Sequence, residues 1–412
     1  MNLLKKILKE NPIVYVTRDL ERASGISLDT SGYFVVANYS DFAQSKIQNR
    51  ANILLIKKER ILDTWELLGE QEVIDFINKI EGCVLVFKNT AQIERICAKQ
   101  SWSLLNPSAK LANDMEGKIS QIDFFKKFKK NFLDYKISKI KDIVWQGQEF
   151  ILQFNSSHTG SGTLIMKNAE DLEKLQNKFP NRLARVADFI SGPVFTSNNV
   201  VNRDRVLLSN ISYQITGLRP FTNSRFATIG NDWGVVSKIL EKEKILEYRQ
   251  IVLEIGEYLC AKGWRGLFGI DIILDSENDK LKIIEINARQ PASTVYESEL
   301  QDGVRNLVPS TQDKINIFTS HLLSLSEINF NNDLMEIQNG SQIILRKDLN
   351  KNINLEKIIP LLEELGCSVI VYDNEKENSD LLRIQSKESI VVGHNVFSEL
   401  GERIREVLNS NF

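Results

Sequence analysis

Residues 266–294 read GLFGIDIILDSENDKLKIIEINARQPAST, a pattern that predicts two β-strands joined by a polar turn. Alternate side chains of a strand lie on the same face of a sheet. Glu285, Asn287 and Arg289 are each two residues apart, so they share one face, and the apolar residues between them share the other. Asp271 stands in the preceding strand between two isoleucines. The hairpin therefore carries two acids, an amide and a guanidinium on strands that are otherwise hydrophobic.

These polar residues predict a site for a hard divalent cation. A carboxylate on a largely buried strand costs several kcal/mol unless it is paired or bound to a metal. Asp271 alone is also explained by a structural ion pair. Asp271, Glu285 and Asn287 together offer three oxygen ligands with no His or Cys nearby, which favours Mg²⁺ or Mn²⁺ over zinc. Arg289 is placed to bind a substrate carboxylate or phosphate in bidentate fashion.

The composition indicates a globular protein without a nucleic-acid or membrane partner. Of 412 residues, 42% are hydrophobic and 26% charged, and 52 basic side chains nearly balance 54 acidic ones. The basic run FKKFKK (125–130) is short and typical of a solvated helix face. No segment approaches the ~18 to 20 apolar residues that a membrane span needs. Four scattered cysteines without a CxxC pair indicate reduced thiols, and we expect a cytoplasmic protein.

The order of predicted elements indicates several domains of mixed α/β and α+β class. Residues 1–105 alternate strand-like and helix-like segments, which predicts a small α/β layer with parallel strands. No GxGxxG follows the first strand, so we expect no dinucleotide site there. Residues 106–330 hold helices, a strand-rich region, a long amphipathic helix and the hairpin. Residues 331–412 predict a small α+β domain.

A glycine-rich loop precedes the hairpin by about the length of a nucleotide-binding domain. The sequence SSHTGSGT (156–163) follows a predicted strand, and Gly160 and Gly162 would let backbone N–H groups approach an anion. A plain hairpin turn explains the same residues. His158, inside the loop, would either contact a phosphate or be exposed to solvent.

These motifs, in this order, resemble the ATP-grasp superfamily of carboxylate–amine ligases and carboxylases. MEGKISQ (115–121) resembles the lysine segment before the ATP site, FILQFNSSHTGSGT (150–163) the strand and loop over the triphosphate, and RVADFISGP (185–193) the hinge at the adenine edge. GIDIIL and IIEINAR resemble the metal-binding end. The resemblance implies an ATP-grasp fold, with a nucleotide held between two subdomains of residues 106–330. It implies nucleotide contacts by Lys118, Gln153, His158, Thr159, Gly160, Ser161, Gly162, Thr163, Ala187, Asp188, Phe189 and Ile190.

The chain departs from the family pattern at two places. Gln153 stands where the family usually has a lysine, so one positive charge that would offset the triphosphate is missing. In the hinge, Ala187 and Asp188 replace the commoner pattern of Glu followed by Lys or Glu. Lys118 or Lys167 could substitute for the missing lysine, and the sequence leaves this open.

A polar stretch between a predicted strand and helix, residues 209–234, has the character of a substrate loop. Arg219, Arg225 and Asn231 are candidates for holding a carboxylate substrate, and an ordinary exposed loop explains them equally.

The resemblance implies an ATP- and Mg²⁺-dependent enzyme that joins a small carboxylic acid to an amine through an acyl phosphate. Glu285 would bridge two metal ions with Asp271 and Asn287, and Arg289 would orient the carboxylate. The resemblance also allows a homodimer, although the sequence shows no interface. Three alternatives stay open: a carboxylase using bicarbonate, a non-catalytic nucleotide-binding protein, and a structural protein whose hairpin acids pair with lysines.

Overall fold

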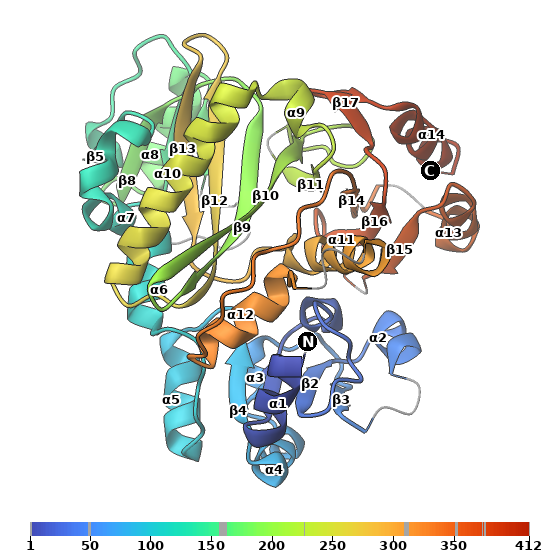
Figure 1. Ribbon diagram of the computed structural model, residues 1–412. Helices are drawn as coiled ribbons and strands as arrows, with labels where there is room; N and C mark the ends of the chain where they lie inside the picture. The colour runs from blue at the N-terminus through green and yellow to red at the C-terminus, as the bar shows by residue number, and fades with distance from the viewer. Residues whose placement is uncertain are drawn as a thin grey trace.

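The structure is a computed structural model that describes residues 2–47, 51–155, 163–225, 227–308, 313–350, 353–372, 374 and 376–411. The sequence-predicted loop residues His158, Thr159, Gly160, Ser161 and Gly162 lie outside the described residues. Figure 1 shows an N-terminal layer, a long central sheet above it, and a smaller sheet beside one end of the central sheet.

The N-terminal layer is a four-stranded sheet in the order β3-β2-β1-β4, and the pairs are parallel, as the alternating pattern predicted. Its strands are β1 (Ile13–Val16), β2 (Tyr33–Asn38), β3 (Ile53–Ile56) and β4 (Cys83–Val86). The helices of this part are α1 (Asn2–Glu10), η1 (Leu20–Ala23), α2 (Asp41–Lys46), α3 (Thr64–Leu67), α4 (Gln71–Ile80) and α5 (Ala91–Gln100). Valine-rich strands form the core of this layer, as is usual for parallel sheets covered on both faces.

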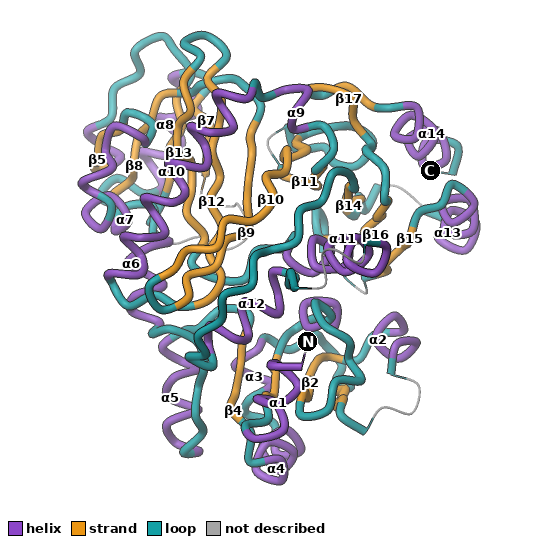
Figure 2. The backbone as a smooth tube through the Cα atoms, viewed as in Figure 1, coloured by secondary structure: helices purple, strands orange, loops and turns teal. Residues whose placement is uncertain are grey.

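A small antiparallel sheet follows in the order β5-β8-β6-β7. Its strands are β5 (Tyr135–Lys139), β6 (Phe150–Gln153), β7 (Thr163–Met166) and β8 (Leu183–Asp188). Helix α8 (Ala169–Lys178) buries Leu172 against one face. The small sheet lies beside the central sheet (Figure 2). On its other face, Ala187 packs with Ile273 of the central sheet. The segments before it are α6 (Ala109–Glu116), α7 (Ser120–Phe124), η2 (Lys126–Asn131) and η3 (Ile140–Asp142).

The central sheet has eight strands in the order β13-β12-β9-β10-β11-β14-β16-β15. Its first strands are β9 (Val194–Asn202), β10 (Arg205–Thr216), β11 (Thr228–Asp232), β12 (Gly266–Asp275) and β13 (Lys280–Asn287). Helix α10 (Lys242–Ala261) covers one face and α11 (Thr294–Leu307) the other. Accordingly, Ser197 bonds Tyr248 of α10, and its neighbour Asn198 bonds Glu297 of α11. Helices α9 (Val236–Ile239) and α12 (Ile317–Leu325) complete this region.

The C-terminal strands continue the central sheet, because β14 pairs with β11. They are β14 (Ser341–Arg346), β15 (Ser368–Val371) and β16 (Asp380–Ser386), with α13 (Leu355–Glu364), α14 (Glu399–Asn409) and the β17 (Val391–Gly393) and β18 (Val396–Phe397) hairpin. The division into domains at residues 105 and 330 stays a prediction. Across the described ranges, no helix combines the length and the apolar character needed to cross a bilayer.

Candidate functional site

The strand register places the two hairpin acids directly opposite each other. Asp271 of β12 pairs with Glu285 of β13, and Asn287 pairs with Gly269 two positions along. Cross-strand neighbours of an antiparallel pair project to the same face, with Cβ atoms roughly 5 Å apart. The two carboxylates and the amide therefore share one face of the central sheet.

Polar side chains extend this row across the sheet. Asp271 pairs with Thr196 of β9 on its other side and accepts hydrogen bonds from Thr196 and from Gln214 of β10. On β11, Asn231 donates to Ser212 Oγ at 3.1 Å, and it receives a bond from Gln342 at 3.2 Å. The sequence-predicted substrate residue Asn231 therefore belongs to the same polar row as the predicted metal ligands.

Lys118 brings a positive charge to this row. Its Nζ lies 2.8 Å from Glu285 Oε1, and its side chain is 10% exposed. Lys118 lies just before Ile119, the N-cap residue of α7, and the N–H groups of Ile119 and Ser120 donate to Asn155 Oδ1 at 2.9 and 3.2 Å. Asn155 follows β6, so this cap ties the lysine segment to the strand that leads into the glycine-rich loop.

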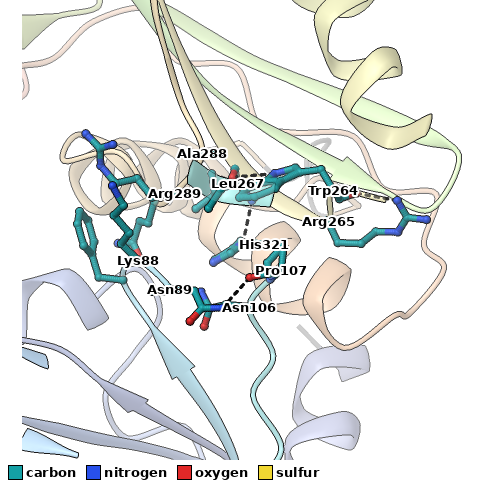
Figure 3. A pocket seen from close by; sticks show the side chains of 13 residues that line it. Lys88, Asn89, Asn106, Pro107, Trp264, Arg265, Leu267, Ala288, Arg289 and His321 are labelled. Carbon is teal, nitrogen blue, oxygen red and sulfur yellow. Dashed lines mark hydrogen bonds between the residues drawn. The ribbon is translucent and has the colours of Figure 1, made fainter. Parts of the chain in front are cut away.

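A second charged cluster lies beside the hairpin, where Arg289 follows β13. Glu116, the last residue of α6, pairs with both Arg289 and Lys88. Lys88 follows β4 of the N-terminal sheet, so the cluster joins two parts of the fold. Figure 3 shows Lys88 and Arg289 together on one side of a small pocket between these parts. Because two cations share one carboxylate, the pocket keeps a net positive charge at this edge.

The two hairpin acids differ in their electrostatic surroundings. Burial and the neighbouring Glu285 raise the pKa of Asp271 to about 6, although the hydrogen bonds from Thr196 and Gln214 oppose this. Burial also works against the charge of Glu285, but Lys118 and Arg289 outweigh it and lower the pKa of Glu285. The charge of Asp271 is therefore the unfavourable one of the two, and a cation bound beside it would lower its cost.

The donor set fits Mg²⁺ or Mn²⁺. Asp271 and Glu285 supply carboxylate oxygens and Asn287 an amide oxygen, the ligand types that hard cations take. Within the described ranges, no cluster of three or more His, Cys, Asp or Glu side chains could hold a metal ion. The protein would therefore supply few ligands and leave coordination positions for water and phosphate, as is usual for Mg²⁺ in nucleotide enzymes.

The predicted hinge connects the two sheets. Ala187 is buried, Asp188 is exposed, and Phe189 and Ile190 are half-buried between β8 and β9. A β-carbon at Gly192 would lie 1.8 Å from the carbonyl oxygen of Leu274, so only glycine lets the segment cross β12 this closely.

Three residues predicted to bind substrate or nucleotide lie away from the polar row of the central sheet. Arg219 and Arg225 are exposed on the loop between β10 and β11, and their substrate role stays a prediction. Gln153 is buried and donates to Thr163 Oγ1 at 3.2 Å on the small sheet. Sequence analysis missed four residues of the site, which are Lys88, Glu116, Thr196 and Gln214. The alternating polar positions of β9 and β10 could have indicated Thr196 and Gln214.

Asp271→Asn is expected to raise the free energy of unfolding of the metal-free protein by roughly 1 to 3 kcal/mol at about pH 7. The pKa of Asp271 is about 6 in the folded protein and 3.8 ordinarily, so between these values the folded state holds a proton that the unfolded chain has released. Stability is therefore lost as the pH rises through this window, and the whole cost is present above it. Urea unfolding of both proteins at about pH 7 and pH 4 measures the effect.

Asp275→Asn, on the same strand, is the matched control. The hydrogen bond from Asn278, which outweighs burial, lowers the pKa of Asp275, so this variant should lose stability at neutral pH instead of gaining it. If Asp271→Asn raised the free energy of unfolding equally at both pH values, the stabilisation would not come from removing the charge of Asp271.

Comparison with curated proteins finds one relative, which matches part of the chain. No protein-family model matches it. The butirosin acyl-carrier protein–L-glutamate ligase of Niallia circulans is 26% identical over 195 residues, which are 45% of this chain and 43% of that relative. The chain thus spans less than half the length of the curated relative that it matches.

Solved structures match the fold over nearly the full length. An N5-carboxyaminoimidazole synthase from Aspergillus clavatus, in complex with ADP and 5-aminoimidazole ribonucleotide, has a TM-score of 0.67 at 12% identity and covers 97% of this chain and 98% of its own. An L-amino acid ligase from Bacillus licheniformis has a TM-score of 0.64 at 14% identity and covers 96% of each chain. With the small sheet facing a polar row on the central sheet, this protein therefore has the ATP-grasp fold, as the resemblance implied.

Proposed function

We propose that the protein is an ATP-dependent ligase that activates a substrate carboxylate as an acyl phosphate and joins it to an amine. The observation that carries the proposal is the pairing of Asp271 with Glu285 on the face of the central sheet that meets the small sheet. Its support is the fold, together with the names of the N. circulans and B. licheniformis ligases.

The residues of the hairpin would bind the terminal phosphates of ATP. Mg²⁺ ions held by Asp271, Glu285 and Asn287 would neutralise the β- and γ-phosphate oxygens. Lys118, now paired with Glu285, would turn its ammonium toward a phosphate once cations take over the carboxylate. Phosphoryl transfer of this kind needs position and charge more than a protein nucleophile.

The cluster beside the pocket would bind the acid. Arg289 and Lys88 share Glu116, so a substrate carboxylate can approach without meeting net negative charge. Its oxygen would attack the γ-phosphorus, the bond to ADP would break, and an amine would then displace phosphate from the acyl carbon. Arg289 would stabilise the negative oxygen of the tetrahedral intermediate.

A screen for ADP release tests this proposal. Purified protein with ATP and Mg²⁺ is incubated with pools of carboxylic acids and amino acids, and mass spectrometry identifies the products. The name of the N. circulans relative puts L-glutamate and an acyl-carrier protein in the first pool. We expect ADP and phosphate in equal amounts with an amide product.

Labelled bicarbonate in a parallel screen distinguishes the carboxylase alternative. ADP release that requires bicarbonate and gives a labelled carboxylate product would replace the amide-ligase proposal. Failure to bind Mg²⁺–ATP would contradict both.

A further inference from the structure

Arg185 on β8 is a buried cation without an anionic partner. Its side chain belongs to a residue that is 1% exposed, and its Nε and Nη1 atoms have no hydrogen-bond partner among the described residues. A buried charge that is neither paired nor hydrogen-bonded costs several kcal/mol. An anionic ligand bound beside Arg185 would supply the missing partner.

The strand register points this guanidinium into the space between the two sheets. Arg185 pairs with Gln153 on β6 and Ile137 on β5, so these side chains share one face of the small sheet. Ala187, two residues along, lies on the same face and packs with Ile273 of β12. Arg185 therefore faces the central sheet and not the α8 side.

The surroundings of Arg185 include two aromatic rings and one acid, Glu285. Its guanidinium carbon lies 5.2 Å from the centre of the Tyr135 ring and 5.9 Å from that of Phe132. Burial lowers the pKa of Arg185 to about 10, while the nearby Tyr135 and Glu285 act in the opposite direction. The group therefore stays charged at neutral pH, held by ring contacts worth only about 0.5–2 kcal/mol.

The other cations near the hairpin already have partners. Lys118 pairs with Glu285, and Lys88 and Arg289 pair with Glu116. No ion pair of Arg185 is found among the described residues, so its fork of donors stays available to an anion that enters between the sheets. Such a fork matches phosphate and carboxylate groups, and the nucleotide proposed to bind between the sheets carries phosphates.

We infer that Arg185 binds a phosphate group of the nucleotide and supplies, from the neighbouring strand, the positive charge that Gln153 cannot supply. The inference rests on the proposed nucleotide-dependent function. It also explains how the chain could bind a triphosphate with glutamine at position 153, where the family usually has lysine. Arg185 and Gln153 are cross-strand partners on one face of the small sheet.

Isothermal titration of Arg185→Met with Mg²⁺–ADP and with adenosine tests the inference. We expect the affinity for Mg²⁺–ADP to fall roughly 10- to 100-fold, the value of one charge-assisted phosphate contact, and the affinity for adenosine to stay unchanged. Arg185→Lys keeps the charge but lacks the bidentate fork, so its affinity for Mg²⁺–ADP should lie between those of wild type and Arg185→Met. It also provides a folded variant if methionine is not tolerated.

Two further variants distinguish a role of Arg185 in nucleotide binding from a purely structural role. Arg383→Met removes another buried arginine, 2% exposed and with an unpartnered Nε, from β16, and should leave Mg²⁺–ADP affinity unchanged whatever stability it loses. Gln153→Lys added to Arg185→Met should restore most of the affinity, because the new charge enters the same face.

Wild-type affinity for Mg²⁺–ADP in Arg185→Met would overturn the inference and leave the ligase proposal standing. An equal loss of ADP and adenosine affinity would also overturn it, because that pattern reports a damaged cleft. A wild-type protein that binds no adenine nucleotide would instead overturn the proposed function and this inference with it.

Discussion

Glu285→Gln is expected to lower kcat roughly 10³-fold, with little change in the folded structure. Glu285 lies opposite Asp271 and 2.8 Å from Lys118. Glutamine at this position removes the negative charge that would hold the proposed Mg²⁺ ions and that pairs with Lys118. The substitution keeps the shape of the side chain. A fall in kcat would therefore result from the loss of negative charge beside the reacting phosphates. ADP release with the substrate pair found by the screen measures it.

The matched control is Glu277→Gln. Glu277 is exposed in the turn of the same hairpin, so its variant should keep wild-type turnover. Turnover of Glu285→Gln within about threefold of wild type would exclude Glu285 from the metal site. Adding a higher Mg²⁺ concentration should recover part of the loss if the variant only weakens metal binding.

Arg289→Met is expected to separate nucleotide binding from chemistry. The affinity for Mg²⁺–ADP should stay within about twofold of wild type, whereas kcat should fall roughly 10²- to 10³-fold, because in the proposed reaction the guanidinium would act on the acid and on the developing oxyanion. Single-turnover ADP release and titration of Mg²⁺–ADP on the same preparation measure the two quantities. Arg289→Lys should recover little, because lysine lacks the bidentate fork.

Arg203→Met is the control for this variant. Arg203 is exposed and donates from Nε to the carbonyl oxygen of Glu327 at 3.1 Å, outside the proposed site. A loss of nucleotide affinity in Arg289→Met as large as its loss of turnover would contradict the assignment of Arg289 to the acid, and would place it with the nucleotide.

The hairpin and the parallel N-terminal layer were predictable because their patterns are local. Period-two alternation in IIEINAR fixes which side chains share a face, and the structure places Glu285 and Asn287 on neighbouring positions of one face. The short apolar strands separated by helices likewise indicate parallel pairing, which the structure has.

The remaining parts of the site depend on contacts between distant segments. Glu116 ends a helix and Lys88 follows a strand, and no local pattern indicates that both reach Arg289. The pairing of Arg185 with Gln153 depends on a strand register that a sequence does not contain. The sequence RVADFISGP resembles a hinge, and nothing in it indicates a role for Arg185 at its start.

The continuation of the central sheet into the C-terminal strands has the same cause. Residues 341–346 form a plain strand with no mark of a partner, and the structure pairs them with β11. That contact lines up Gln342 with Asn231 and so extends the polar row. Side-chain periodicity predicts faces, whereas the order of strands follows from packing of the whole chain.

A crystal structure of the protein with Mn²⁺ and a non-hydrolysable ATP analogue, with the anomalous signal of manganese recorded, tests the central claim most directly. The proposal predicts manganese peaks between Asp271 and Glu285, roughly 2.0–2.3 Å from their oxygens and from phosphate oxygens, with Lys118 released from Glu285. Manganese bound elsewhere, or a nucleotide bound while Lys118 still pairs with Glu285 and no metal lies between the two acids, would contradict it.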